Sequence, residues 1–130
     1  MRIYIAARFD RRDEMAVVAR ELRRAGHVVT STWVQPHDEP LPDVVCAIND
    51  IDDLATADCL VSFTEEPTEQ VSWAARGGRH VEFGYALAAG MRLCLVGPRE
   101  NVFHHLPSVE AYGTTAELVE ALAAEGKVAS

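Results

Sequence analysis

The stretch Arg76-Gly-Gly-Arg-His-Val-Glu-Phe-Gly-Tyr-Ala-Leu-Ala-Ala-Gly90 has the pattern of a loop that leads into a helix. Its apolar residues recur at helical spacing, at Val81, Tyr85 and Ala88, and the final glycine is placed to end the helix. Glu82 then lies in or near the first helical turn, where the helix dipole and unpaired N–H groups favour an ionised carboxylate.

An ionised glutamate in a cleft is the kind of group that can attack a sugar carbon as a nucleophile. Gly84 is unfavourable inside a helix by roughly 1 kcal/mol relative to Ala. We therefore expect another backbone or a ligand to come very close to Gly84. The alternative interpretation of Glu82 is a surface glutamate on a small-residue helix that packs against a sheet.

The composition is that of a soluble globular protein with one domain over residues 1–130. A formal net charge of −8 argues against a general nucleic-acid binder, but it allows a small anionic ligand held by local arginines. No apolar run approaches the roughly 20 residues of a membrane span, and the start has no signal-peptide pattern. We expect a cytoplasmic protein whose three cysteines, Cys46, Cys59 and Cys94, are reduced core residues.

Strand-like and helix-like segments alternate along the chain. Strands are predicted at 3–7, 28–33, 59–63, 93–96 and 109–112. Helices are predicted after a cap at Asp10, over 43–57, through the Glu82 stretch, and from a capping box at Thr114 to Gly126. In the helix over 43–57 the predicted buried residues are Val44, Ile48, Ile51 and Ala55. This alternation predicts an α/β fold with a parallel sheet and helices on both faces.

Ligands of such sheets bind outside the carboxyl ends of the strands, where the strand order reverses. The loops after the first, third and fourth strands open at this edge. They carry Arg8, the segment 76–79, and the segment 99–101. The Glu82 helix begins at the same edge, which supports a functional role for Glu82.

Four acids gather in the second predicted helix and just after it: Asp50, Asp52, Asp53 and Asp58. Asp50 borders the predicted buried stripe, whereas Asp52 and Asp53 are predicted to face water. Asp58 precedes a strand and can equally cap a turn. Two carboxylates in one cleft allow one to attack while the other donates a proton, so we consider a pairing of Asp50 with Glu82.

Other chemistries lack their motifs. His80-x-Glu82 matches half of the zinc deaminase signature, but no Pro-Cys-x-x-Cys follows it. The adjacent pair at 104–105 is not at metal-ligand spacing, and neither a dinucleotide fingerprint nor a P-loop is present. We expect no metal and no cofactor. Trp33 and Trp73 are candidates for stacking on a base, although Trp33 can equally be an edge residue of the core.

Three features together resemble the nucleoside 2-deoxyribosyltransferase superfamily, which includes 2′-deoxynucleoside 5′-phosphate N-hydrolases and related pyrimidine nucleotide hydrolases. They are Tyr4-Ile-Ala-Ala7, Asp50 with Asp58 eight residues later, and Glu82-x-Gly-x-Ala86. The similarity covers nearly the whole chain in element order. It implies a flavodoxin-like, Rossmann-like three-layer sandwich whose sheet has the order 2-1-3-4-5.

The resemblance also implies roles for single residues. Glu82 would attack C1′ of deoxyribose, Asp50 would assist the departing or incoming base, and Tyr4 would hold the nucleophile by a hydrogen bond. The family works as dimers or higher oligomers, in which the loop after the fourth strand completes the neighbour's site. The predicted substrate-binding residues are Ala6, Arg8, Phe9, Trp33, Asp58 (as a structural or sugar-side acid), Arg76, Gly78, Arg79, Asn101 and His104.

One position departs from the family pattern. Transferases of the family carry an Asp six residues before the nucleophile, and the phosphate hydrolases carry a Ser, whereas this chain has Arg76. Together with Arg79 and Arg8, Arg76 can hold a 5′-phosphate, or these arginines are solvated loop charges. The choice between transfer and hydrolysis therefore stays open.

The leading hypothesis is an enzyme that cleaves the N-glycosidic bond of a 2′-deoxynucleoside through a glycosyl-Glu82 intermediate and transfers the sugar to another base. The first alternative is a 5′-monophosphate N-hydrolase that releases the free base. A second alternative is a nucleotide-binding module without chemistry, and a receiver- or flavodoxin-like signalling domain ranks last. In each enzymatic case the partner is a small nucleoside or nucleotide, and we expect a homodimer or higher homo-oligomer with shared sites.

Overall fold

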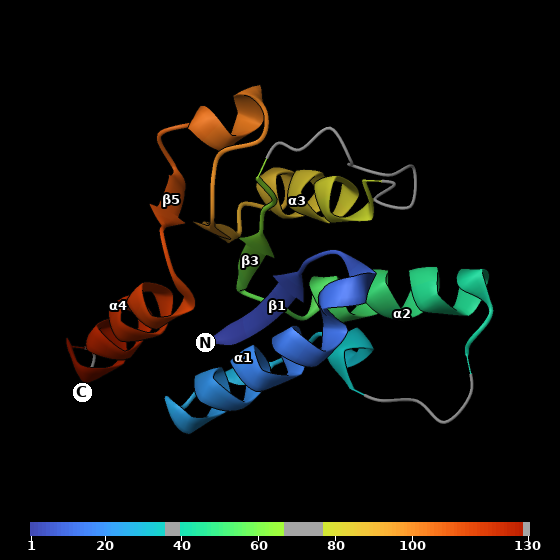
Figure 1. Cartoon of the computed structure of the whole chain (residues 1–130), viewed down its shortest axis with the longest axis horizontal. Coiled ribbons are helices and arrows are strands. Elements are labelled where there is room, and N and C mark those ends of the chain that lie inside the picture. Colours follow the sequence, from blue (N-terminus) through green and yellow to red (C-terminus); the bar gives the residue numbers. More distant parts are fainter. Residues whose placement is uncertain (36–39, 67–76, 129–130) are drawn as a thin grey trace.

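A computed structural model describes residues 1–35, 40–66 and 77–128 (Figure 1). Strands and helices alternate along these ranges as the sequence predicts. The strands are β1 (Arg2–Ala6), β2 (Val28–Val29), β3 (Cys59–Phe63), β4 (Arg92–Val96) and β5 (Val109–Tyr112). The helices are α1 (Arg12–Arg24), α2 (Asp43–Ala55), α3 (Gly78–Ala88) and α4 (Thr115–Val128), with short 3₁₀ turns η1 (Phe9–Arg11), η2 (Thr32–Val34) and η3 (Val102–His105).

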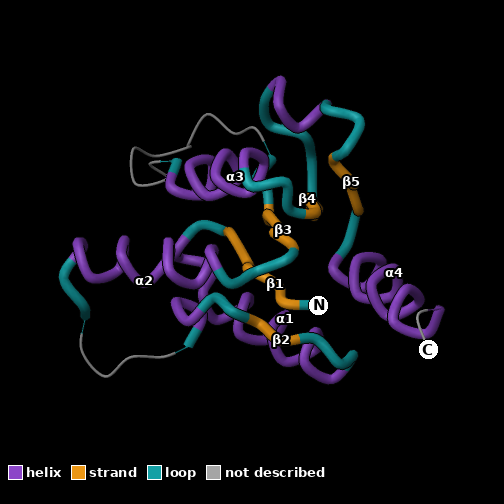
Figure 2. The backbone as a smooth tube through the Cα atoms, turned by 180° about the vertical axis from the view of Figure 1, so that it is seen from behind, coloured by secondary structure: helices purple, strands orange, loops and turns teal. Residues whose placement is uncertain are grey.

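The five strands form one parallel sheet in the order β2-β1-β3-β4-β5, which confirms the predicted topology (Figure 2). Side chains alternate between the two faces of such a sheet. Along β1, Ile3 and Ile5 therefore point to one face, and Tyr4 and Ala6 point to the other.

Two hydrophobic cores lie on the two faces of the sheet. On one face, Ile3 and Ile5 pack with Met15 and Leu22 of α1 and with Leu118 of α4. On the other face, the residues of β1, β3 and β4 pack with α2 and α3, through Tyr4, Ala6, Leu54, Leu60, Phe83, Ala86, Leu93 and Leu95. The structure is thus a three-layer sandwich (Figure 1). In the part of the chain that is described, no helix is long and apolar enough to cross a membrane.

Two predictions near the start of the chain are wrong in detail. The second strand is limited to Val28–Val29, and the segment after it forms the η2 turn, which contains Trp33. Asp10 does not cap α1, because η1 precedes this helix and its N-terminal flanking residue is Arg11. The Asp10 carboxylate instead accepts a hydrogen bond from Arg8 at 2.8 Å.

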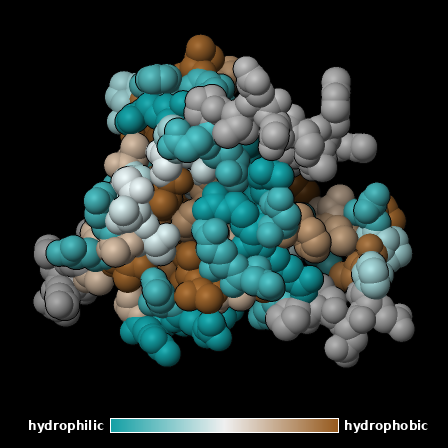
Figure 3. Space-filling model, viewed as in Figure 1, coloured by the Kyte–Doolittle hydropathy of each residue, from teal (hydrophilic) through white to brown (hydrophobic). Residues whose placement is uncertain are grey.

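The buried face of α2 also differs from the prediction. The stripe of Val44, Ile48 and Ile51, which we call the α2 stripe, is exposed to 65%, 55% and 43% respectively. Within α2, all of which is described, only Leu54 is fully buried. Apolar surface is visible over α2 on the right of Figure 3. The helix therefore turns its polar residues toward the sheet edge and leaves an apolar stripe uncovered.

The three cysteines are divided between the core and the surface. Cys59 and Cys94 are buried free thiols, as expected, but Cys46 is exposed on α2 and is not a core residue.

The helix of the opening stretch begins at Gly78 and ends after Ala88, where Gly90 adopts a positive φ of 73°. This ending confirms the predicted stop. The buried residues of α3 are Arg79, Phe83 and Ala86, and not the apolar residues singled out by spacing.

The predictions for Gly84 in α3 and for the two ends of α4 have different outcomes. Apart from the neighbouring residues and backbone of α3 itself, no atom of the described chain lies within 4 Å of a Cβ built on Gly84, so the close approach of another backbone is absent there. Half of the Thr114 capping box is present, since the Thr114 hydroxyl accepts from the N–H of Glu117 at 3.2 Å, whereas the Glu117 carboxylate accepts from the N–H of Gly113 at 3.0 Å. The helix α4 continues past Gly126 to Val128.

Candidate active site

Three polar side chains from three elements meet on the sheet face that α2 and α3 cover. Tyr4 comes from β1, Asp50 from α2 and Glu82 from α3. Tyr4 is fully buried, and its hydroxyl donates a hydrogen bond to Glu82 Oε2. Because Tyr4 alternates with Ile3 and Ile5 along β1, the strand register itself directs this hydroxyl toward α3.

A cleft of about 470 Å³ opens over Asp50 and Glu82. Its walls come from the segment after β1, the η2 turn, the start of α2 and the start of α3. The lining residues are Ala7, Arg8, Phe9, Asp10, Thr32, Trp33, Leu41, Cys46, Asn49, Asp50, Gly77, Gly78, Arg79 and Glu82. The cleft thus lies at the carboxyl edge of the sheet, where the sequence predicts it.

Burial dominates the electrostatics of Glu82. It raises the pKa of the Glu82 carboxyl to about 7, while the Tyr4 hydrogen bond lowers this pKa and the Asp50 charge raises it further. The expectation that the helix start favours the ionised form of Glu82 is therefore wrong. Glu82 is the fifth residue of α3, past the first-turn amides, and helix-end effects are confined to that turn.

The carboxyl of Asp50 is also perturbed. Burial first, and the Asp53 charge second, raise the pKa of Asp50 to about 6, while the nearby Tyr4 hydroxyl lowers this pKa. Burial and the Glu82 carboxylate raise the pKa of the Tyr4 hydroxyl, so Tyr4 remains a hydrogen-bond donor. Two interacting carboxyls that titrate near neutral pH behave as one coupled pair, and near pH 6.5 this pair holds about one proton.

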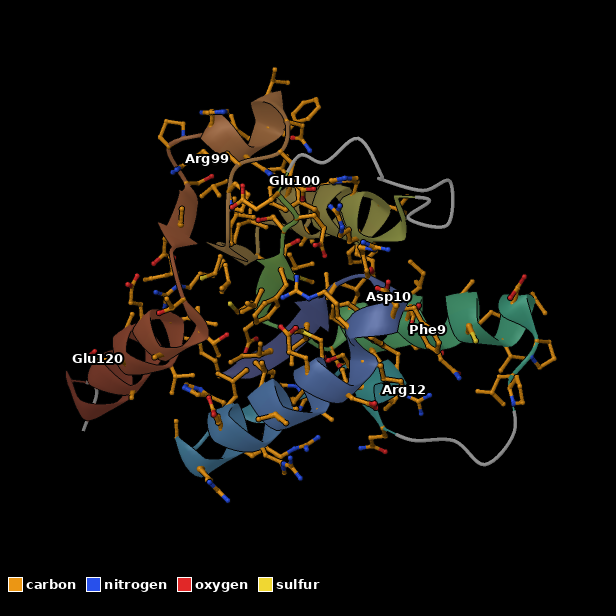
Figure 4. All side chains as sticks on the ribbon, in the orientation of Figure 1. Phe9, Asp10, Arg12, Arg99, Glu100 and Glu120 are labelled. Carbon is orange, nitrogen blue, oxygen red and sulfur yellow. The ribbon has the colours of Figure 1, made fainter. Side chains whose placement is uncertain are left out.

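An aromatic corner forms one wall of the cleft. The indole Nε1–H of Trp33 donates to the Ile5 carbonyl at 2.8 Å, which fixes the ring against β1. The Phe9 ring lies 6.4 Å from the Trp33 ring, tilted by 37°. Phe9 is 69% exposed, and the Arg12 guanidinium lies 5.7 Å from the centre of its ring (Figure 4). Large flat surfaces of this kind suit a planar base.

The two described arginines of the cleft already have acidic partners. Arg8 pairs with the exposed Asp10 at 2.8 Å. Arg79 is buried and makes a two-pronged ion pair with Glu100, with N–O distances of 2.5 and 2.7 Å. The sequence does not indicate this pair, because Glu100 lies 21 residues away on the segment after β4. Arg76, like Trp73, lies outside the described residues.

Several predicted site residues lie elsewhere. Asp58 is at the amino end of β3, on the opposite edge of the sheet, where it accepts from the Arg2 backbone N–H at 3.1 Å. The prediction that Asp58 binds the sugar is therefore wrong, and its structural role is the one observed. Ala6 is buried under the site, and the next residue, Ala7, lines the cleft in its place.

The segment after β4 also differs from the expectation. His104 is fully buried, accepts from the Glu100 backbone N–H at 3.0 Å, and contacts the Phe83 ring edge-on at 4.8 Å between centroids. Its side chain is thus part of the interior under α3 and not of the surface. Asn101 caps η3 by accepting from the Phe103 N–H at 3.0 Å. Its amide also lies 3.5 Å from His80 Nδ1, which orients it toward the start of α3.

Sequence reasoning missed some residues of the site. Leu41, Cys46 and Asn49 line the cleft from α2 and the residues before it. Helical spacing places Asn49 and Asp50, three and four residues after Cys46, on the same side of α2 as Cys46. Asp53 does not line the cleft but accepts hydrogen bonds from Thr32 next to the aromatic corner. No sequence signal indicates this contact, since it joins residues 21 positions apart.

A second hollow, of about 510 Å³, lies next to the first and shares Arg8 with it. Its charged residues include Arg11, whose guanidinium already pairs with Glu14 and Glu65. Tyr4, Asp50 and Glu82 do not line it. The first cleft is therefore the candidate active site. Among the described residues, no three His, Cys, Asp or Glu side chains are grouped as a metal site requires.

Comparison with solved structures places this fold among known proteins. The chain is similar to the Clostridium botulinum CMP N-glycosidase BcmB, with 22% identity, a TM-score of 0.57, and coverage of 94% of this chain and 98% of that one. It is similar to a 2-deoxyribosyltransferase from Bacillus psychrosaccharolyticus, with 17% identity, a TM-score of 0.68, and coverage of 92% and 90%. A conserved protein from Enterococcus faecalis V583 matches with 13% identity, a TM-score of 0.64, and coverage of 92% and 95%.

No protein-family model matches the sequence, and no curated protein matches it. The structural matches show a shared fold over nearly the full length of each chain. The resemblance to the nucleoside 2-deoxyribosyltransferase superfamily is thus confirmed at the level of the fold.

Proposed function

We propose that this protein cleaves the N-glycosidic bond of a 2′-deoxynucleoside and transfers the deoxyribosyl group to another base. The observation that carries the proposal is the meeting of Tyr4, Asp50 and Glu82 at one cleft, with both carboxyls titrating near neutral pH. A surface glutamate would have neither a buried tyrosine donor nor a second perturbed carboxyl beside it.

In the first half-reaction, a Glu82 carboxylate oxygen forms a bond to C1′ while the bond between C1′ and the base nitrogen breaks. The electron pair of the broken bond stays on the base, and the protonated carboxyl of Asp50 supplies a proton to it. In the second half-reaction, a nitrogen of the incoming base attacks C1′, its proton returns to Asp50, and the Glu82 carboxylate leaves. The base lies against the aromatic corner of Phe9 and Trp33.

The proton balance of the pair sets a condition on this mechanism. The productive form has Glu82 ionised and Asp50 protonated. With pKa values of about 7 and about 6, the opposite one-proton form, with Glu82 protonated and Asp50 ionised, is favoured in the free protein. The Tyr4 hydrogen bond favours the productive form, because it stabilises the ionised carboxylate of Glu82.

The test is incubation of the protein with a deoxynucleoside and a foreign base, with product analysis by chromatography and mass spectrometry. A new deoxynucleoside supports transfer, and a covalent adduct on the Glu82 peptide supports the intermediate. Glu82→Gln is the matched control and is expected to give neither. Full turnover by this variant would overturn the assignment of the nucleophile, and binding of nucleosides without any product would favour the non-catalytic module.

A second candidate is hydrolysis of a nucleoside 5′-monophosphate, with water in place of the incoming base. Two observations favour it: the similarity to a CMP N-glycosidase and the position of Arg8 in the cleft wall. Against it, Arg79 is neutralised by Glu100. Release of free base and sugar phosphate from a monophosphate, without transfer to an added base, would favour this second candidate.

We further propose that a second copy of the chain covers the α2 stripe. Three large apolar side chains in a row on one helix are unusual on a free surface, and the same helix supplies Cys46, Asn49 and Asp50 to the cleft. Ile48→Glu is expected to shift the protein to a smaller species in light scattering. The matched control is Val17→Glu, at an apolar residue of α1 that is 44% exposed on the other face. A monomeric wild-type protein would contradict this proposal.

A further inference from the structure

Asp53 makes a contact that its sequence position does not suggest. It lies on α2, three residues after Asp50 and thus on the next turn of the same helix face. Its Oδ2 accepts a hydrogen bond from the Thr32 backbone N–H at 2.9 Å and a second from the Thr32 hydroxyl at 2.7 Å. The sequence predicts that Asp53 faces water, whereas its carboxylate joins α2 to the η2 turn.

This contact holds one wall of the cleft. The η2 turn has no side-chain cap of its own, and Asp53 serves as a cap from another element. On its other side the turn is tied to β1, because Ser31 Oγ accepts from the Ile5 N–H at 3.1 Å and Trp33 donates to the Ile5 carbonyl. The position of the Trp33 ring relative to Asp50 is therefore set by β1 on one side and by Asp53 on the other.

Asp53 also acts on Asp50 by its charge. The charged and titratable groups around Asp50 are Tyr4 from β1, Glu82 from α3 and Asp53 from α2, and the cleft wall adds Arg8, Asp10, Arg79 and the Cys46 thiol. Both arginines of this set pair with other acids. The Asp53 charge raises the pKa of Asp50, second in size only to burial.

We propose that Asp53 is a positioning residue of the reaction, which fixes the aromatic wall through Thr32 and keeps Asp50 in its proton-donating form. The proposal rests on the proposed function, because it assigns to Asp50 the role of acid. Asp53 itself does not line the cleft and touches no reacting atom.

Two substitutions separate the two effects. In Asp53→Asn the amide oxygen can still accept both Thr32 hydrogen bonds, but the charge is gone. The acidic limb of the pH–kcat profile, which follows the lower of the two pKa values, is expected to move to lower pH by about half a unit or more, with a lower maximal kcat, as for a unit charge about 5 to 6 Å away near a protein surface. In Thr32→Val the hydroxyl donor is lost, and KM is expected to rise with an unchanged pH profile.

Asp52→Asn is the matched control. It removes the same charge from the neighbouring position of α2, where the side chain is exposed, and is expected to leave both KM and the pH profile within about twofold and 0.2 unit of wild type. An unchanged pH profile in Asp53→Asn, or an equal shift in Asp52→Asn, would overturn the electrostatic half of the proposal. An unchanged KM in Thr32→Val would overturn the structural half.

A measurement that needs no turnover keeps this test apart from that of the proposed function. Carboxyl ¹³C NMR titration of Asp50 in the wild-type protein and in Asp53→Asn reports the coupling directly. If no nucleoside is turned over, the proposed function fails, while a lowered Asp50 midpoint in Asp53→Asn still supports the contact and its charge effect. An unshifted midpoint contradicts the inference in either case.

Discussion

The burial of Glu82 predicts a stability effect that does not depend on any substrate. A carboxyl whose pKa is higher in the folded protein than in the unfolded chain stabilises the fold when protonated and destabilises it when ionised. A rise from 4.5 to about 7 corresponds to about 3 kcal/mol, at about 1.4 kcal/mol per pKa unit. Glu82→Gln removes the charge and keeps an acceptor for the Tyr4 hydroxyl.

The substitution Glu82→Gln is expected to stabilise the protein, and the size of this stabilisation depends on pH. Above pH 7 the wild-type protein carries a buried charge in the folded state, so Glu82→Gln is expected to be more stable by about 3 kcal/mol at pH 8. At pH 5 the folded-state carboxyl is protonated and the unfolded one is largely ionised, so the advantage falls to about 1 kcal/mol. It disappears as the pH falls further below the unfolded pKa.

Urea unfolding of the wild-type protein and the variant at pH 5 and pH 8 measures this difference. The control is Glu120→Gln, which removes a charge from the exposed face of α4 (Figure 4) and is expected to shift stability equally at both pH values. A Glu82→Gln protein no more stable than wild type at pH 8 would refute the assignment of burial as the main perturbation. So would an advantage of the same size at pH 5.

Three further predictions concern single contacts. Tyr4→Phe keeps the buried ring but removes the donor, so the pKa of Glu82 is expected to rise by about 1 to 2 units, seen as a lower maximal rate and an upward move of the basic limb of the pH–rate profile. Arg79→Met leaves Glu100 unpaired and is expected to lower the free energy of unfolding by about 3 kcal/mol or more, with most of the loss recovered when Glu100→Gln is added. Gly97→Ala is expected to destabilise the protein by more than about 1 kcal/mol in thermal unfolding, because φ is +116° and the added Cβ would lie 2.5 Å from a threonine hydroxyl oxygen.

The strands and their order could be predicted because their signals are local. The apolar run of β3 and the short segment of β5 are each bounded by polar or turn residues that define their limits. The strand–helix alternation defines a parallel sheet. The order 2-1-3-4-5 came from the family resemblance. The Tyr4 contact with Glu82 came from the same source, and strand alternation gives its physical reason.

The errors arose where a side chain's environment is set by a distant segment. Helical spacing correctly placed Val44, Ile48 and Ile51 on one face of α2, but spacing cannot tell which layer covers that face. The sequence suggests that Arg79 is a free cation, because its partner Glu100 lies 21 residues further along the chain. The sequence predicts Asp53 to be a solvated acid, because its partner, Thr32, lies in a turn that the sequence predicts as a strand.

Two opposing effects act on the ionisation of Glu82, which are stabilisation of the anion by the helix end and destabilisation of the anion by burial. Helix-end stabilisation of an anion amounts to about 0.3 to 1 kcal/mol and fades after the first turn. Burial acts in the opposite direction and disfavours the ionised form by about 3 kcal/mol, as the rise of the Glu82 pKa from 4.5 to about 7 indicates. The hydroxyl of Tyr4 is then the contact that most favours ionisation, since a hydrogen bond to a charged group is worth about 1.5 to 3 kcal/mol. In the proposed mechanism, Glu82 acts as the nucleophile at neutral pH because β1 directs a tyrosine at it, and the helix end by itself would not suffice.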